Sequence, residues 1–168
     1  MPEQGVVVMV HSGVPNVLAI RHETMHVLTM AVWGGYGAGA WVREGLGVLA
    51  GGQCNGYTPR AVAAYAAQAG TLPTLVELES SFWDQDEITA HLAAASFMGF
   101  LHEERGPSAL RALWLGGLEA LSERLRADPQ ALEANWRAWL GVPSPDTPLP
   151  DWSAVSRGCR WVEPRPAR

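Results

Sequence analysis

Hydrophobic positions recur at helical spacing along most of the chain. Helices are predicted over about residues 16–33, 40–50, 59–69, 86–104, 108–126 and 129–140. In the fifth of these segments, one apolar face is marked by Leu110, Leu113, Trp114, Leu118, Leu121 and Leu125. Residues 71–83, TLPTLVELESSFW, predict a loop with a short helical turn. We expect the core to include Trp33, Trp41, Trp83 and Trp114.

The pattern changes at both ends of the chain. Residues 5–10, GVVVMV, are short and β-branched, which is typical of a strand. The predicted class is therefore mostly α (α+β), with a small N-terminal β element and a helical C-terminal part. Residues 141–150, GVPSPDTPLP, contain four prolines and resemble a linker. We accordingly divide the chain into one domain over residues 1–141 and a Pro-rich linker and tail over residues 142–168, whose Trp152 and Trp161 are expected to pack back.

Composition excludes some partners. The net charge is −5, and the twelve cationic residues are all arginines. They are scattered singly along the chain, so the sequence has no basic stripe of the kind that binds nucleic acid. No apolar run approaches the roughly 18 residues of a membrane span. Residues 5–10 are also too short for a signal-peptide core, and Glu3 precedes them. We expect a cytoplasmic protein or an excised domain of a longer one. The oligomeric state stays open.

The two cysteines, Cys54 and Cys159, are distant and lack CxxC spacing. This excludes a redox motif and a cysteine-based zinc site. We expect two free thiols. A disulfide stays open if the protein is exported.

The strongest chemical signal is the stretch AIRHETMHVL, in which His22 and His26 lie four residues apart on a predicted helix. Residues at this spacing share a helix face, so both imidazoles can reach one metal ion. Glu23 follows the first histidine and is placed to accept a proton from water at that ion. By itself the motif also fits an ordinary helix whose histidines are hydrogen-bonded.

A catalytic zinc ion needs a third protein ligand, and Glu44 is the candidate. It lies in a second predicted helix, after the break GGYGAG, so the two helices can pack against each other. Gly45 and Gly47 carry no side chains, which would let this helix approach the first one closely. By itself Glu44 is also compatible with a solvated surface carboxylate.

These segments together resemble the gluzincin metallopeptidases, including the peptidase MA-like domains and, more distantly, the aminopeptidase N family. HExxH is followed by the segment WxxEGLxxxxxG. Two later blocks, AHLAAASFMGFLHEERGPSALRALW and ALEANWRAWL, are similar to the family's closing helices, so the resemblance covers about residues 17–141. It implies a zincin-like fold, a peptide or protein substrate and one zinc ion (Zn2+) per chain. The implied zinc ligands are His22, His26 and Glu44, with Glu23 as the general base.

His91 is the main departure from the family pattern, because the family has a tyrosine there that stabilises the oxyanion. Three interpretations stay open: His91 donates that hydrogen bond itself, the site has lost its usual chemistry, or His91 is a fourth zinc ligand. A second departure is the front sheet, for which only residues 5–10 are available.

The two departures support a rival interpretation of the function. In it, the chain is a catalytically inactive gluzincin-fold domain that binds zinc structurally and serves as an interaction module. A third, weaker interpretation is a metal-free helical domain.

Overall fold

The computed structural model describes residues 17–141, 150–155, 157–160 and 162, which form helices joined by short turns. The helices are α1 Val17–Trp33, α2 Ala40–Gly51, α3 Pro59–Ala69, α4 Leu75–Ser80, the short 3₁₀ helix η1 Phe82–Asp84, α5 Glu87–Arg105, α6 Pro107–Leu125, α7 Pro129–Leu140 and α8 Trp152–Val155. The mostly α class is confirmed. The strand predicted over residues 5–10 lies outside the described residues, and those described contain no strand. No described helix is long and apolar enough to cross a membrane.

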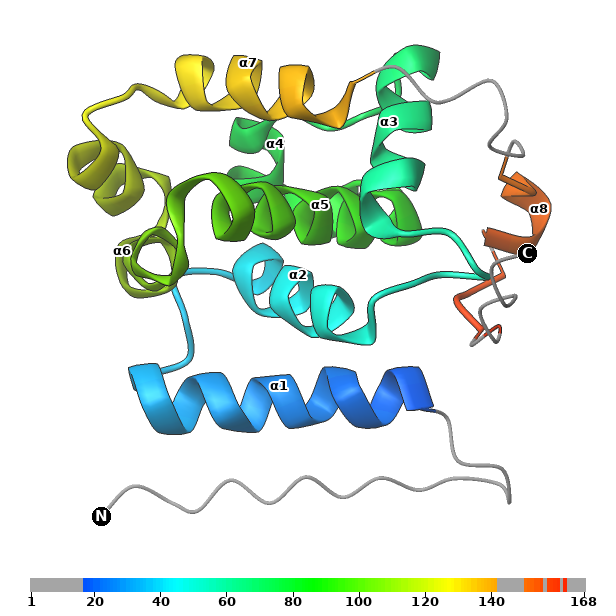
Figure 1. Cartoon of the computed structure of the whole chain (residues 1–168), viewed down its shortest axis with the longest axis horizontal. Coiled ribbons are helices and arrows are strands. Elements are labelled where there is room, and N and C mark those ends of the chain that lie inside the picture. The colour runs from blue at the N-terminus through cyan, green and yellow to red at the C-terminus, as the bar shows by residue number, and fades with distance from the viewer. Residues whose placement is uncertain (1–16, 142–149, 156, 161, 163–168) are drawn as a thin grey trace.

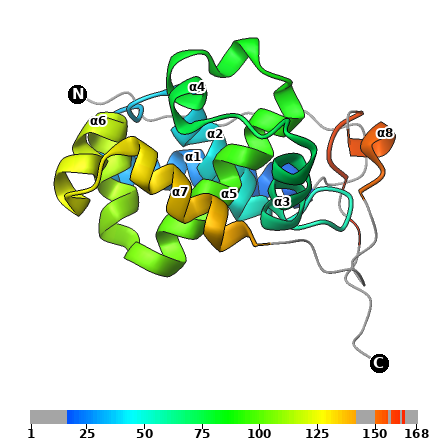
Figure 2. The ribbon, with the colours of Figure 1, turned by 90° about the horizontal axis from the view of Figure 1, so that it is seen from above.

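The helices stack in layers around α5 (Figure 1). α1 packs on α2, α2 packs on α5, and the other side of α5 is covered by α3 and α7, with α4 packed against α7. Seen from above, α7 runs over α5, while α6 lies at one end of the molecule and α8 at the other (Figure 2). The helix α1, which carries His22 and His26, therefore packs on a helix that is itself held by the central helix.

α5 is buried because its sequence is apolar on every side over residues 92–101. Its small residues let α2 approach closely: a Cβ placed on Gly45 would lie 3.0 Å from both the carbonyl carbon and the Cβ of Ala94. Gly45 therefore serves the contact of α2 with α5, and not the contact with α1 that the sequence predicted. Trp41 stacks on Phe97, with ring centroids 5.9 Å apart, which fixes the start of α2 against α5.

α6 contains a kink that the sequence pattern did not indicate. Gly116 and Gly117 have non-helical backbone angles, and Gly117 is left-handed with φ 67°. The Leu118 backbone N–H after the kink donates to Glu79 Oε1 over 2.7 Å. Both halves of α6 keep an apolar face, so the predicted series of leucines is buried except for Leu125, which is partly buried.

Cys54 and Cys159 form a disulfide, so the expectation of two free thiols is wrong. The residues are 105 positions apart, and the bond joins the tail to the turn after α2. Asn55 adds three hydrogen bonds to the tail: its backbone N–H donates to Arg160 O over 3.1 Å, its Oδ1 accepts from Arg160 N–H over 2.9 Å, and its Nδ2 donates to Gly158 O over 3.3 Å. The described part of the tail is thus fastened to the helical body. Trp161 lies outside the described residues, and Trp152 is 41% exposed.

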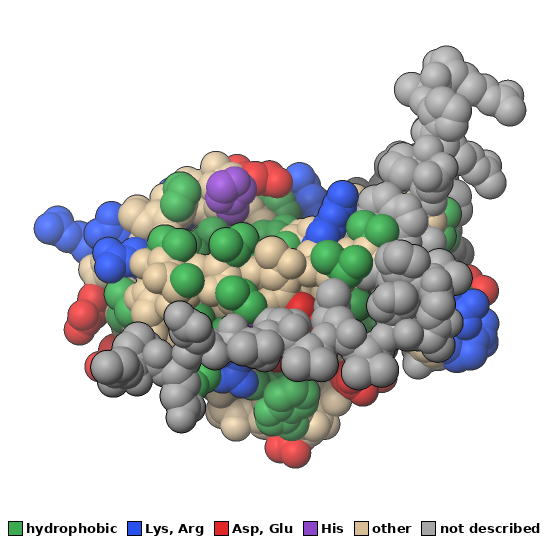
Figure 3. Space-filling model, turned by 90° about the horizontal axis from the view of Figure 1, so that it is seen from below, with side chains coloured by type: hydrophobic (Ala, Val, Ile, Leu, Met, Phe, Trp, Pro, Cys, Tyr) green, Lys and Arg blue, Asp and Glu red, His purple; other side chains and the backbone are tan. Residues whose placement is uncertain are grey.

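The outer face of α1 also carries apolar side chains, with Ile20, Leu28 and Val32 exposed. The face of the molecule on this side shows hydrophobic side chains spread over its described part (Figure 3). α1 therefore carries apolar side chains on its outer face as well as on the side that packs on α2.

Candidate metal centre

The two histidines of the motif lie on α1, one helical turn apart. Their ring centroids are 4.6 Å apart, and the ring planes are nearly perpendicular, at 86°. Both side chains are mostly buried, with exposures of 21% for His22 and 17% for His26. The helical spacing thus brings two imidazoles together at the surface that α1 turns toward α2.

Glu44 approaches these histidines from α2. Its Oε2 atom lies 3.0 Å from His22 Nε2 and 3.7 Å from His26 Nε2. The approach depends on Gly47, because a Cβ built there would lie only 2.7–2.8 Å from three atoms of the His22 ring. Gly47 therefore has the role that the sequence suggested, since it leaves the space that the His22 ring occupies.

The three side chains can hold one metal ion. One ligand atom from each of His22, His26 and Glu44 lies within 4.8 Å of the other two. A tetrahedral zinc ion with bonds of about 2.0–2.2 Å separates its ligand atoms by roughly 3.4 Å, a value between the two distances from Glu44. Two imidazole nitrogens and one carboxylate oxygen are also a donor set that suits zinc. The residues therefore fit such an ion in number, chemistry and spacing.

Electrostatics keep Glu44 in its charged form. Partial burial by itself would raise the pKa of Glu44, but hydrogen bonds from His22 and His26, and their charges, outweigh it. The net effect holds the pKa of Glu44 well below its ordinary value. The carboxylate is thus ionised, as a metal ligand must be.

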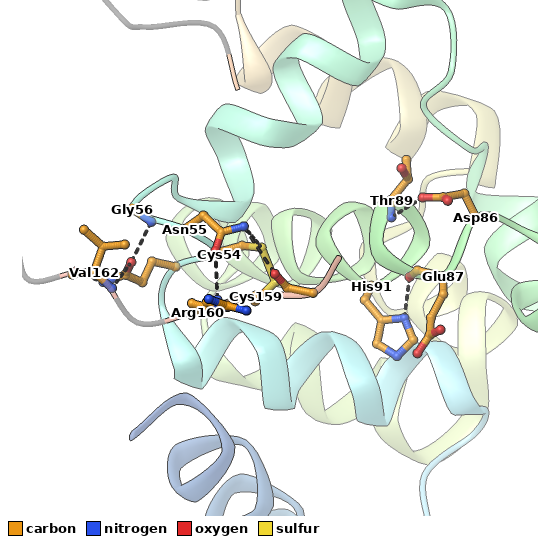
Figure 4. The surroundings of a disulfide bond; sticks show 12 residues. Cys54, Asn55, Gly56, Asp86, Glu87, Thr89, His91, Cys159, Arg160 and Val162 are labelled. Carbon is orange, nitrogen blue, oxygen red and sulfur yellow. Dashed lines mark hydrogen bonds between the residues drawn. A yellow bond between two sulfur atoms is a disulfide. The ribbon is translucent and has the colours of Figure 1, made fainter. Parts of the chain in front are cut away.

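His91 lies at the start of α5 and points toward the same carboxylate. Its Nε2 is 3.9 Å from Glu44 Oε2, yet it is not one of the three atoms that can share an ion. Its Nδ1 lies 2.6 Å from the backbone carbonyl oxygen of Glu87 (Figure 4). Because a carbonyl oxygen only accepts, Nδ1 carries the proton, and the neutral ring presents an unprotonated Nε2 to the site. His91 can donate from Nε2 only when the ring is protonated.

Glu23 is not one of the three candidate ligands and follows His22 on α1. It lines a cavity of about 240 Å³, together with His22 and Gly47. All five residues predicted for the site, Glu23, His22, His26, Glu44 and His91, therefore lie around the contact between α1, α2 and the start of α5.

Aromatic side chains border the site on the His91 side, and the sequence analysis did not assign them a place there. The ring centroids of Phe82 and Trp83 lie 4.9 Å and 6.0 Å from that of His91. Trp83 is 66% exposed, so the expectation that it belongs to the core is wrong. It belongs to the short helix η1, at the end of the stretch over residues 71–83 that the sequence predicted to be a loop with a short helical turn.

Comparisons with known proteins add no family to these observations. No protein-family model, curated protein or solved structure matched the chain. The functional argument therefore rests on the residues and their geometry.

Proposed function

We propose that this chain is a zinc-dependent metallopeptidase of the gluzincin type, which hydrolyses bonds in a peptide or protein substrate. The observation that supports this most is the convergence of His22, His26 and Glu44 on a volume that fits one ion. In this proposal these three residues hold one zinc ion per chain. The position of Glu23 next to His22, on the wall of a cavity, supports a hydrolytic role for the centre.

The chemistry divides between the ion and the side chains. Zinc at such a centre supplies Lewis acidity and makes water a better nucleophile at neutral pH. The Glu23 carboxylate accepts a proton from the attacking water as the new carbon–oxygen bond forms at the substrate carbonyl. Glu23 then returns this proton to the amine that leaves when the carbon–nitrogen bond breaks. Glu44 remains ionised throughout.

His91 has the position of an oxyanion donor in this proposal. Its Nε2 faces the centre and its Nδ1 is held by Glu87. Since the neutral ring has no proton on Nε2, His91 donates to the developing oxyanion as an imidazolium. This differs from a tyrosine, whose hydroxyl donates while neutral.

The rival function is that of a zinc-binding domain without hydrolysis, which serves as an interaction module. The contact of His91 Nδ1 with the Glu87 carbonyl oxygen is the specific observation that favours it, because a neutral His91 with its proton on Nδ1 cannot donate from Nε2 to an oxyanion. The His91→Tyr variant separates the two proposals. If wild type is inactive on a diverse peptide library and the tyrosine variant remains inactive with zinc bound, the rival is favoured.

The Glu23→Gln variant tests the proposed mechanism. We expect it to retain zinc and lose peptide hydrolysis, because an amide cannot accept the proton. Glu104→Gln, on the exposed end of α5, is the matched control and should leave turnover unchanged. An unchanged rate of hydrolysis in Glu23→Gln would show that the mechanism is wrong.

The Cys54–Cys159 disulfide indicates the kind of compartment in which such an enzyme would be found. Disulfides persist in oxidising compartments and are rare in the cytosol. We propose an oxidising compartment in place of the cytoplasmic location expected from the sequence, and the Cys54–Cys159 bond is the observation that supports it.

A further inference from the structure

A cavity of about 240 Å³ adjoins the candidate metal centre on the side of Glu23. It lies between the first half of α1, the second half of α2 and the tail. Besides His22 and Glu23, the described residues that line it are Leu18, Ala19, Gly47, Val48, Gly51, Gln53 and Cys159. The cavity thus begins at the proposed general base and ends at the disulfide.

The walls of this cavity favour an apolar occupant. Among the described lining residues, Glu23 is the one acidic side chain and none is an arginine. Gln53 is committed elsewhere, because its Nε2 donates to Val162 O over 2.6 Å and its Oε1 accepts from Gly56 N–H over 2.7 Å. Aliphatic residues of α1 and α2 supply most of the remaining wall. An acidic group would be repelled by the Glu23 carboxylate.

The size of the cavity suits one side chain. Pockets for whole small molecules usually measure about 300–1,000 Å³, and this cavity is smaller. Gly51 helps to keep it open: a Cβ there would stand in ordinary contact, 3.7 Å from Leu18 Cδ2, and a longer side chain would extend into the space. The cavity is therefore large enough for an aliphatic side chain such as that of leucine.

The far wall belongs to the tail and is rigidly attached. Cys159 is bonded to Cys54, and Asn55 and Gln53 hold the neighbouring tail residues by hydrogen bonds (Figure 4). This wall comes from beyond residue 141, and so from outside the stretch that resembles the peptidase family. The wall that the tail supplies is thus particular to this chain.

We propose that this cavity receives an aliphatic side chain of a peptide bound across the metal centre, from the residue next to the cleaved bond. The inference rests on the proposed function, because the proximity of Glu23 and His22 is what connects the cavity to a cleaved bond. It adds a substrate preference: peptides with a leucine-like side chain at that position over those with glycine or an acidic residue.

The test fills the cavity from α1. Ala19→Leu places a side chain in it, whereas Ala31→Leu makes the same change at an exposed position of the same helix. Two peptides that differ only in a leucine or glycine next to the scissile bond are compared. Binding of each is measured by calorimetric titration in the Glu23→Gln background, where no cleavage is expected, and turnover is measured in parallel with active Glu23.

Burial of a leucine side chain predicts that the leucine peptide binds roughly ten to a hundred times more tightly than the glycine peptide. Ala19→Leu should reduce this ratio to about threefold or less, and Ala31→Leu should preserve it. If Ala19→Leu does not fold, Gly51→Leu fills the cavity from α2 and has the same expected effect.

Binding and turnover separate the two proposals. Equal binding of the two peptides, or a preference that the filling variants leave intact, overturns the cavity assignment whether or not peptides are cleaved. Selective binding that the filling variants abolish, without turnover of any peptide, supports the cavity and overturns the hydrolytic function. If neither peptide binds, the cavity assignment is overturned.

Discussion

Gly47 on α2 lies directly against the imidazole ring of His22 on α1. A Cβ at residue 47 would approach three atoms of that ring to 2.7–2.8 Å, which is closer than such atoms pack. The ring is the far end of a side chain, so it would move before the helices do. The geometry of the candidate metal centre thus depends on a residue that has no side chain.

The Gly47→Ala variant should therefore lose metal affinity without losing its fold. Displacement of the His22 ring is expected to weaken zinc binding by about 10- to 100-fold, the size typical of changes that disorient a ligand. The helix itself should gain up to about 1 kcal/mol, because alanine is the better helix former. Zinc affinity is measured by competition with a chelating dye.

Gly51→Ala is the matched control, one turn further along α2. Its Cβ would make an ordinary contact of 3.7 Å with Leu18 Cδ2, one turn before His22 on α1. Its zinc affinity should equal that of the wild type. Equal affinities for all three proteins would refute the dependence of His22 on Gly47.

Removal of the Cys54–Cys159 disulfide should destabilise the protein. The bond closes a loop across a separation of 105 residues, and loss of such a bond typically costs about 2–4 kcal/mol. The Cys54→Ser/Cys159→Ser double variant should unfold at lower denaturant, and adding reductant should affect the wild type alone. A wild-type protein that titrates two free thiols in its native state would contradict the disulfide.

The Asp86 cap at the start of α5 should make a pH-dependent contribution to the free energy of unfolding. Asp86 caps this helix by accepting a hydrogen bond from Thr89 N–H over 2.9 Å. Hydrogen bonds from the Thr89 side chain and backbone lower the pKa of Asp86. A lowered pKa in the folded state adds stability above the unfolded pKa of about 3.9, and this stability is lost as the pH falls through the folded value.

Asp86→Ala should accordingly reduce the free energy of unfolding by about 1 kcal/mol at pH 7. The difference from the wild type should shrink as the pH falls below about 4. Chelator is present throughout, so that metal release does not contribute. Glu104→Ala, at the opposite end of α5, should cause no comparable loss. A deficit in Asp86→Ala that stays the same down to pH 2 would rule out the charged cap as its cause.

The helices were largely predictable because they depend on local signals. Pro59 and Pro129 begin α3 and α7 as their positions suggested, and Gly106-Pro107 separates α5 from α6. The kink at Gly116-Gly117 was not predicted, since the apolar spacing continues through it. The backbone N–H of Leu118, just after the kink, donates to Glu79, a distant residue that a local pattern does not contain.

The site was predictable only where spacing determines geometry. His22 and His26 are four residues apart, and residues at that spacing on a helix share one face. The glycine-rich turn between α1 and α2 lets the two helices pack together, so that Glu44 lies near both histidines. The tautomer of His91 depends on the Glu87 carbonyl oxygen, and the disulfide depends on where an aperiodic tail folds back. Those features arise from tertiary contacts, so they required the structure.

The zinc content of the purified protein tests the central claim most directly, with Glu44→Ala as the variant and Glu104→Ala as the control. We expect about one zinc ion per wild-type and control chain and much less in Glu44→Ala. Chelator should lower the melting temperature of the first two proteins, because the ion joins α1 to α2. A wild-type protein that binds no zinc, or a Glu44→Ala protein that binds as much as the wild type, would contradict the account.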